Sequence, residues 1–180
     1  ASPEWIAERI AATQNFTAKV ATFTDNGITA QGFTFDTVPP EVEGTVDRVL
    51  LIRALHNLNR FQQKAGTRSQ ALAATHAMLK QDGLVGVVQH RAPATASKEW
   101  ADGNKGYLNE VAVIAMFAEA GFALVAQSEI NANPMDQPSG EDNVWQLPPS
   151  LRGNSDDEQR DAMVAIGESD RMTLLFRKAP

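Results

Sequence analysis

The chain of 180 residues contains no cysteine, which excludes disulfides, thiolate metal sites and cysteine nucleophiles. No apolar stretch approaches the roughly 20 residues of a membrane-spanning helix. We expect no signal peptide in residues 1–20, because they are charged and amphipathic. Lys and Arg number 16 against 22 Asp and Glu, so the basic stripe of a nucleic-acid-binding protein is missing. We therefore expect no membrane or nucleic-acid partner, while the compartment stays open between cytoplasm and periplasm.

The composition that remains is that of an ordinary globular protein. Hydrophobic residues make up 43% and charged residues 21%, which is enough to bury a core. The length predicts a single domain over residues 1–180. Neither a Gly-x-Ser-x-Gly elbow nor a Walker-type phosphate loop is present, which argues against hydrolases and nucleoside triphosphatases.

Before Asp47, the sequence predicts one long helix and one strand. Ser2-Pro3-Glu4 is a favourable helix start, and the helix should run over 3–24 and end at Asn26-Gly27. A strand is predicted over 28–36, ending near Asp36.

From Asp47 onward, short apolar runs alternate with helical patterns. This alternation predicts an α/β fold with a doubly wound, mostly parallel sheet and helices on both faces. The predicted strands are 49–52, 84–89, 122–126 and 171–177, and the predicted helices are 58–64, 67–80, 109–120 and 156–166.

Four segments resemble successive parts of one known fold. Residues 47–59, DRVLLIRALHNLN, are similar to the fourth strand of class I S-adenosylmethionine-dependent methyltransferases and the turn after it. Residues 78–90, MLKQDGLVGVVQH, resemble the helix end and fifth strand of these enzymes. The segment 119–122 resembles the helix end before the sixth strand, and 167–178 resembles the closing strand, which the resemblance implies is antiparallel. Within that fold, the ordered set is most similar to a family of bacterial predicted methyltransferases.

The resemblance also implies elements that these residues do not contain. The fold uses a glycine-rich turn after its first strand and a carboxylate after its second to hold the cofactor. Both should lie upstream of Ser2, because the helix over 3–24 resembles the one after the second strand. We therefore expect a methyltransferase-like domain that lacks its first strands and is incomplete at its N-terminus. Unpaired sheet edges would make a homodimer plausible.

Candidate site residues follow the predicted strands, because open parallel sheets bind ligands at the carboxyl ends of their strands. The resemblance implies that Asp36 binds the adenine amino group, although a loop or turn carboxylate is an alternative. Arg53, His56 and Asn57 follow the fourth strand, where the fold faces the transferable methyl group. We predict that Arg53 and Asn57 contact the cofactor. His56 is either a general base or the cap of the next helix.

A second group of candidates follows the fifth strand. Neighbouring strand ends should bring His90 close to His56, so that either imidazole is a candidate base. A metal site that adds Glu110 is a weaker alternative. Arg91 either binds an acidic substrate or pairs with an Asp, and Tyr107 either lines the substrate site or packs in the core.

The leading hypothesis is methyl transfer from S-adenosylmethionine to a small molecule by in-line displacement. Two alternatives remain open. One is a non-catalytic module of the same fold that serves binding or assembly, and the other is a metal-dependent enzyme on the same scaffold.

Overall fold

The computed structural model describes residues 2–24, 27 and 29–180. The chain forms two compact units, Ala1–Val42 and Glu43–Pro180. No helix among the described residues combines the length and the apolar character needed to cross a bilayer.

The N-terminal unit contains two helices in place of the one predicted over 3–24. These are α1 (Pro3–Gln14) and α2 (Phe16–Ala21), which meet at Asn15. Thr13 Oγ1 donates to the carbonyl of Arg9 at 3.0 Å, a back-bond that weakens helices. The helix is interrupted at Asn15, whose backbone, φ −86° and ψ 2°, departs from helical values. Asn26, part of the predicted stop, lies outside the described residues.

The strand predicted over 28–36 is wrong for its described part, residues 29–36, which pair with no strand. All four strands of the described chain belong to the C-terminal unit. Without a neighbouring strand in this unit, local bonds satisfy the backbone instead, as when the Thr34 N–H donates to Thr37 Oγ1 at 3.1 Å. A 3-10 turn, η1 (Pro40–Val42), ends the unit.

The C-terminal unit is built on one four-stranded sheet in the order β1-β2-β4-β3. β1 and β2 pair in parallel, and β4 lies antiparallel between β2 and β3, so three strands share one direction. The predicted α/β class, the mostly parallel sheet and the antiparallel last strand are confirmed. The elements are β1 (Val46–Ile52), α3 (Leu55–Asn59), α4 (Gln62–Ala65), α5 (Thr67–Met78), β2 (Leu79–His90), α6 (Glu110–Glu119), β3 (Phe122–Ser128), η2 (Val144–Gln146), α7 (Asp157–Ile166) and β4 (Arg171–Lys178).

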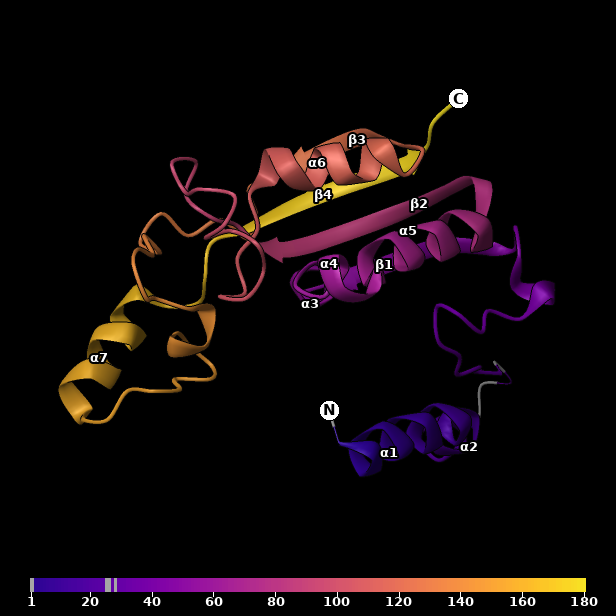
Figure 1. Cartoon of the computed structure of the whole chain (residues 1–180), viewed down its shortest axis with the longest axis horizontal. Coiled ribbons are helices and arrows are strands. Elements are labelled where there is room, and N and C mark those ends of the chain that lie inside the picture. The colour runs from indigo at the N-terminus through magenta and orange to yellow at the C-terminus, as the bar shows by residue number, and fades with distance from the viewer. Residues whose placement is uncertain (1, 25–26, 28) are drawn as a thin grey trace. The chain divides into compact units, whose positions relative to one another are not determined.

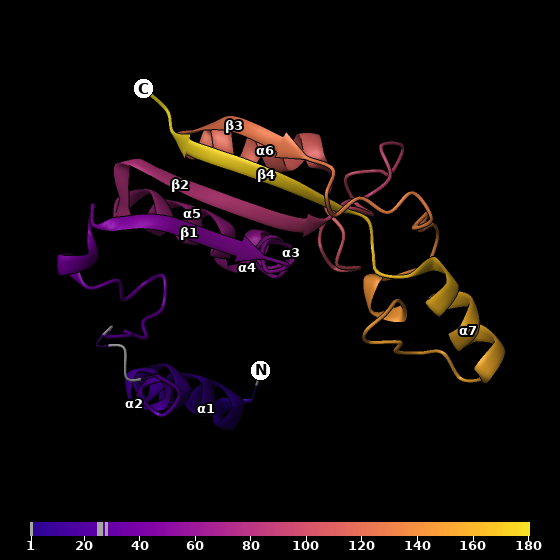
Figure 2. The same ribbon diagram turned by 180° about the vertical axis from the view of Figure 1, so that it is seen from behind.

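Helices α5 and α6 lie against the same face of the sheet, as the two opposite views show (Figures 1 and 2). The connections β1-α5-β2 and β2-α6-β3 both step across the sheet in the same direction. Two right-handed crossovers with the same step place their helices on one face. Within this unit, the prediction of helices on both faces therefore holds for one face only.

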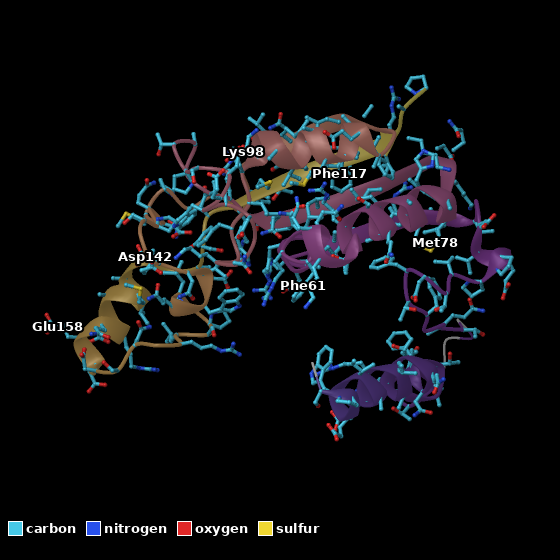
Figure 3. All side chains as sticks on the ribbon, in the orientation of Figure 1. Phe61, Met78, Lys98, Phe117, Asp142 and Glu158 are labelled. Atoms are coloured by element: carbon cyan, nitrogen blue, oxygen red, sulfur yellow. The ribbon has the colours of Figure 1, made fainter. Side chains whose placement is uncertain are left out.

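The core lies between this face and the two helices. Phe117 of α6 is labelled in Figure 3. It and Phe176 of β4 are fully buried, and their rings stack with centroids 4.1 Å apart. Helix α5 ends at Met78, and Leu79 already pairs with Val46 and is fully buried. The predicted continuation to residue 80 is wrong, because core burial of Leu79 overrides the local helical pattern.

Long loops follow β2 and β3, and they gather beyond the carboxyl end of β2 (Figure 1). They contain an apolar cluster separate from the core of the sheet, formed by Ala92, Ala101, Tyr107 and Val144. These loops thus have an apolar cluster of their own within the C-terminal unit.

Candidate active site at the carboxyl ends of β1 and β2

The chain leaves β1 in a sharp turn at Arg53. This residue has a left-handed backbone, φ 52°, while its N–H still donates to Val88 of β2 at 2.7 Å. Helix α3 starts two residues later, which places His56 in its first turn. A positive φ is costly for a residue with a side chain and is often held at functional sites.

His56 and His90 face each other across the ends of the two strands. Their ring centroids are 5.5 Å apart, and the rings are inclined by 50°. Both residues are buried, with 4% and 7% of their surface exposed. The juxtaposition predicted from parallel strand pairing is confirmed, since Ile52 pairs with Val88 two residues before His90.

The fully buried Gln89 defines the protonation state of His56. Its Nε2 donates to the carbonyl of Gly106 at 2.8 Å, so its Oε1 must face the opposite way. There Oε1 accepts from the backbone N–H of His56 at 3.1 Å and lies 3.2 Å from Nδ1 of the same residue. An amide oxygen only accepts, so Nδ1 of His56 carries the proton. The neutral ring then keeps its lone pair on Nε2.

A glycine lets the following loop pack directly onto α3. Gly103 has φ 100°, and a Cβ at this position would lie 2.5 Å from the carbonyl oxygen of His56. The contact is reinforced by Asn59, whose Nδ2 donates to the carbonyl of Asp102 at 2.7 Å. The first turn of α3 is thus held between β2 and this loop.

Both imidazoles are neutral at neutral pH. Burial lowers the pKa of His90 to about 3, and the positive charges of Arg171 and Arg53 act in the same direction. Burial also lowers the pKa of His56, although the hydrogen bond with Gln89 opposes this shift. His90 Nδ1 forms a hydrogen bond of 2.6 Å with the hydroxyl of Ser169. The pair offers neutral donors and acceptors and no charge.

A cavity of about 310 Å³ opens at these strand ends. Trp145 forms one wall, with its ring edge-on to His56 at a centroid distance of 6.0 Å. No Asp or Glu is among the lining residues. Those with polar side chains are Arg53, His56, Asn57, His90, Trp145, Ser150, Ser169 and Arg171. Four of the seven predicted site residues, namely Arg53, His56, Asn57 and His90, therefore share one cavity.

Arg91 does not line this cavity. Its guanidinium is bound by Asp170 at 2.9 and 3.0 Å, by Glu129 at 2.6 and 3.0 Å and by Glu110 at 3.0 Å. Three carboxylates thus occupy its donors, which favours the predicted alternative of pairing with an Asp. The weaker metal hypothesis also loses its carboxylate, because Glu110 binds Arg91 and Gln127. No group of three potential ligands occurs in the part of the chain that the structure describes.

Tyr107 lines a second cavity, of about 270 Å³, and not the first. Its hydroxyl donates to the carboxylate of Asp136 at 3.1 Å, and Asp136 also accepts from the N–H of Asp170 at 2.9 Å. Burial raises the pKa of both Tyr107 and Asp136. Tyr107 also stacks on Trp100, which favours the predicted alternative of core packing.

Asp36 lies in an exposed turn of the N-terminal unit and not at the end of a strand. The hydroxyl of Thr34 donates to its carboxylate and lowers its pKa. The adenine-binding role implied by the resemblance required a strand end, which residues 29–36 do not form. The alternative of a turn carboxylate describes this position.

Gln89, Ser169 and Arg171 belong to the site but were not predicted from sequence. Gln89 alone carried a usable signal, because it is an amide that closes the apolar run from Leu84. Ser169 and Arg171 lie about 80 residues beyond His90, and only the pairing of β4 with β2 brings them to it.

No family model and no curated protein matches the sequence. Solved structures do match it. One is the complex of the Haloferax volcanii Trm112 methyltransferase activator with a protein assigned as a methyltransferase, at 18% identity and a TM-score of 0.55. Another is the Burkholderia thailandensis 1,6-didemethyltoxoflavin-N1-methyltransferase bound to S-adenosylhomocysteine, at 14% identity and a TM-score of 0.51.

The chain has the class I methyltransferase fold. The two matches cover 91% and 100% of it, whereas it spans 68% and 58% of those proteins. The [4+2]-cyclase SpnF also matches, at 12% identity and a TM-score of 0.55, with 90% of this chain and 60% of that protein covered. Because a cyclase matches as well as a methyltransferase does, the reaction must be argued from the site.

Proposed function

We propose that the protein transfers a methyl group from S-adenosylmethionine to a small molecule bound in the cavity at the ends of β1 and β2. The observation that carries this proposal is the buried neutral His56, which lines that cavity and keeps its lone pair on Nε2. We further propose that the protein belongs to the family of bacterial predicted methyltransferases that its sequence resembles.

The residues present fit the methyl-bearing end of the cofactor. Arg53 and Asn57 line the cavity next to His56 and offer N–H donors suited to a carboxylate. The described lining contains no carboxylate that could accept the ribose hydroxyls, so we assign only the amino-acid end to these residues. When bound, S-adenosylmethionine supplies a methyl carbon whose bond to sulfur breaks with its electron pair left on sulfur.

The chain itself would hold the acceptor and receive its proton. As an acceptor oxygen or nitrogen bonds to the methyl carbon, its proton passes to Nε2 of His56. His90, held by Ser169, offers the acceptor a neutral hydrogen-bonding partner and does not compete as a base, because its pKa is about 3. Trp145 covers one side and limits access of water.

Calorimetric titration with S-adenosylhomocysteine, the demethylated product, tests the cofactor assignment. We expect saturable binding that Arg53→Ala weakens roughly tenfold, the loss of one charged hydrogen bond. Arg48→Ala is the matched control, because Arg48 lies on β1, the strand that precedes Arg53, and is exposed. Absence of both a heat signal and a melting shift in the unmodified chain would overturn the proposal and favour the non-catalytic module.

Transfer of labelled methyl groups tests the base. With an acceptor in hand, His56→Ala should slow transfer by roughly 10²–10⁴ while S-adenosylhomocysteine still binds. If the rate is unchanged, His56 is only a structural residue of α3.

A further inference from the structure

The cavity at the ends of β1 and β2 is lined by two cations and no anion. Arg53 enters from the turn after β1, and Arg171 from the first residue of β4. Among the described residues, the carboxylate that pairs with Arg171 is Glu168, which accepts from Nη1, is half exposed and lies outside the lining. With one negative charge beside two positive ones, the cavity has a net positive charge.

Arg171 keeps donors available for a ligand. Its Nη1 binds Glu168, whereas its Nη2 makes no hydrogen bond with another described residue. Arg171 lines the cavity, so this remaining donor can bind an anion there. The hydroxyl of Ser169 lines the cavity two residues away and adds a further polar group.

Arg53 is similarly uncommitted. Its side chain forms no ion pair or hydrogen bond with any described residue, although Glu168 lies within electrostatic range. The left-handed backbone holds it at the strand end, where the guanidinium charge also reaches His90. By contrast, Arg91 on the adjacent strand end is bound by three carboxylates and is not available to a ligand.

We propose that the methyl acceptor is a small carboxylate-bearing molecule whose carboxylate binds Arg171, while Arg53 binds the carboxylate of the cofactor. This rests on the proposed methyl transfer for the acceptor's role but not for the anion site itself. A guanidinium presents N–H groups that match a carboxylate, and Nη2 of Arg171 has no hydrogen-bond partner among the described residues. The cavity of about 310 Å³ has the volume of about ten waters, which suits a compact acid.

The test compares two probes that differ only in charge, 4-hydroxybenzoate and 4-hydroxybenzamide. Each is titrated into the full chain up to tens of millimolar and followed by NMR at the Arg Nε–H and His signals. We expect the acid to bind at least tenfold more tightly than the amide. Arg171→Gln should remove most of this preference, and Arg171→Lys should keep only part of it, because Lys retains the charge but not the planar set of guanidinium N–H groups.

Arg177→Gln is the matched control. It removes one positive charge from the same strand at an exposed position outside the cavity, and it should leave the preference intact. Equal binding of acid and amide, no binding of either, or an equal loss in Arg177→Gln would overturn the proposal. Melting curves show whether each variant is folded.

The titration with S-adenosylhomocysteine separates this inference from the proposed function. If the acid is preferred but S-adenosylhomocysteine does not bind, the anion site stands and methyl transfer fails. If S-adenosylhomocysteine binds and the acid is not preferred, methyl transfer stands and the carboxylate inference fails.

Discussion

The side-chain oxygen of Gln89 binds His56 at two points, accepting from its backbone N–H at 3.1 Å and lying 3.2 Å from its Nδ1. The first contact orients the start of α3, and the second determines the tautomer of the ring. One residue at the end of β2 thus controls both the position and the protonation of the candidate base.

Replacing Gln89 with Glu should raise the pKa of His56. A carboxylate at this position favours the imidazolium, because an opposite charge in contact with the ring stabilises its protonated form. NMR titration of the His56 ring protons measures the shift directly. Gln89→Met, which removes the acceptor without adding charge, is the control. An unshifted or lowered pKa in Gln89→Glu would show that the two side chains are not in contact.

Stability should fall when the pH drops below 6.5. The pKa of His90 is about 3 in the folded chain against 6.5 for an ordinary histidine, so between these values the unfolded state binds more protons. The free energy of unfolding therefore rises with pH in this window, by up to about 1.4 kcal/mol per pH unit for one such group. His56, whose pKa is also lowered, adds to the slope.

Asp136 has the opposite effect on the pH dependence of stability. Its pKa is raised, so above pH 3.8 the folded state binds more protons at this group than the unfolded state does. This contribution makes the free energy of unfolding fall as the pH rises. Urea unfolding between pH 4 and 7.5 measures the net slope. In His90→Asn, the slope should be shallower than in the unmodified chain. Identical slopes in the two proteins would contradict the assignment of His90 as a buried neutral group.

Gly103→Ala should destabilise the protein more than Gly153→Ala does. Both glycines have positive φ, 100° and 82°, so both substitutions carry a backbone cost of roughly 1–2 kcal/mol. Only at Gly103 would the new Cβ meet His56, whereas the space around Gly153 is open. We expect an additional cost of about 1–3 kcal/mol at Gly103 and altered His56 signals. Chemical denaturation compares the two, and equal losses would contradict the close packing.

Tyr107→Phe should destabilise the chain without affecting the first cavity. The substitution preserves stacking on Trp100 but removes the donor to the buried carboxylate of Asp136. The expected loss is about 1–3 kcal/mol, largest at high pH where Asp136 is ionised. Denaturation at pH 5 and 8 measures it. Weaker binding of S-adenosylhomocysteine or of 4-hydroxybenzoate at unchanged stability would instead show that Tyr107 contributes to ligand binding.

The exposed edge of the sheet should mediate self-association. β1 is an edge strand, with Leu50 and Ile52 exposed by 69% and 51%. Unprotected apolar edge strands pair with other chains. Leu50→Lys should therefore shift sedimentation toward monomer, with Gln63→Lys as a control that adds the same charge at an exposed position outside the strand. A sharp melt and a monomeric profile of the unmodified chain would contradict the proposed homodimer.

The local sequence pattern was sufficient to predict those strands whose formation depends on neighbouring residues in the sequence. The runs at 49–52, 84–89 and 171–177 became strands because their apolar side chains need burial on at least one face. Local pattern failed over 29–36, the described part of the predicted strand, because a strand requires a pairing partner that these residues do not have within their unit.

The sequence by itself determined the α/β class, the order of the C-terminal elements and the approach of His56 to His90, since parallel strands end on the same edge. Only the tertiary structure decided which polar groups meet over long separations. Gln89 reaches His56 across 33 positions, and Asp170 reaches Arg91 across 79. Such contacts depend on which strands become neighbours in the sheet. For this reason Arg91 lies outside the cavity at the ends of β1 and β2, and Arg171 lines it.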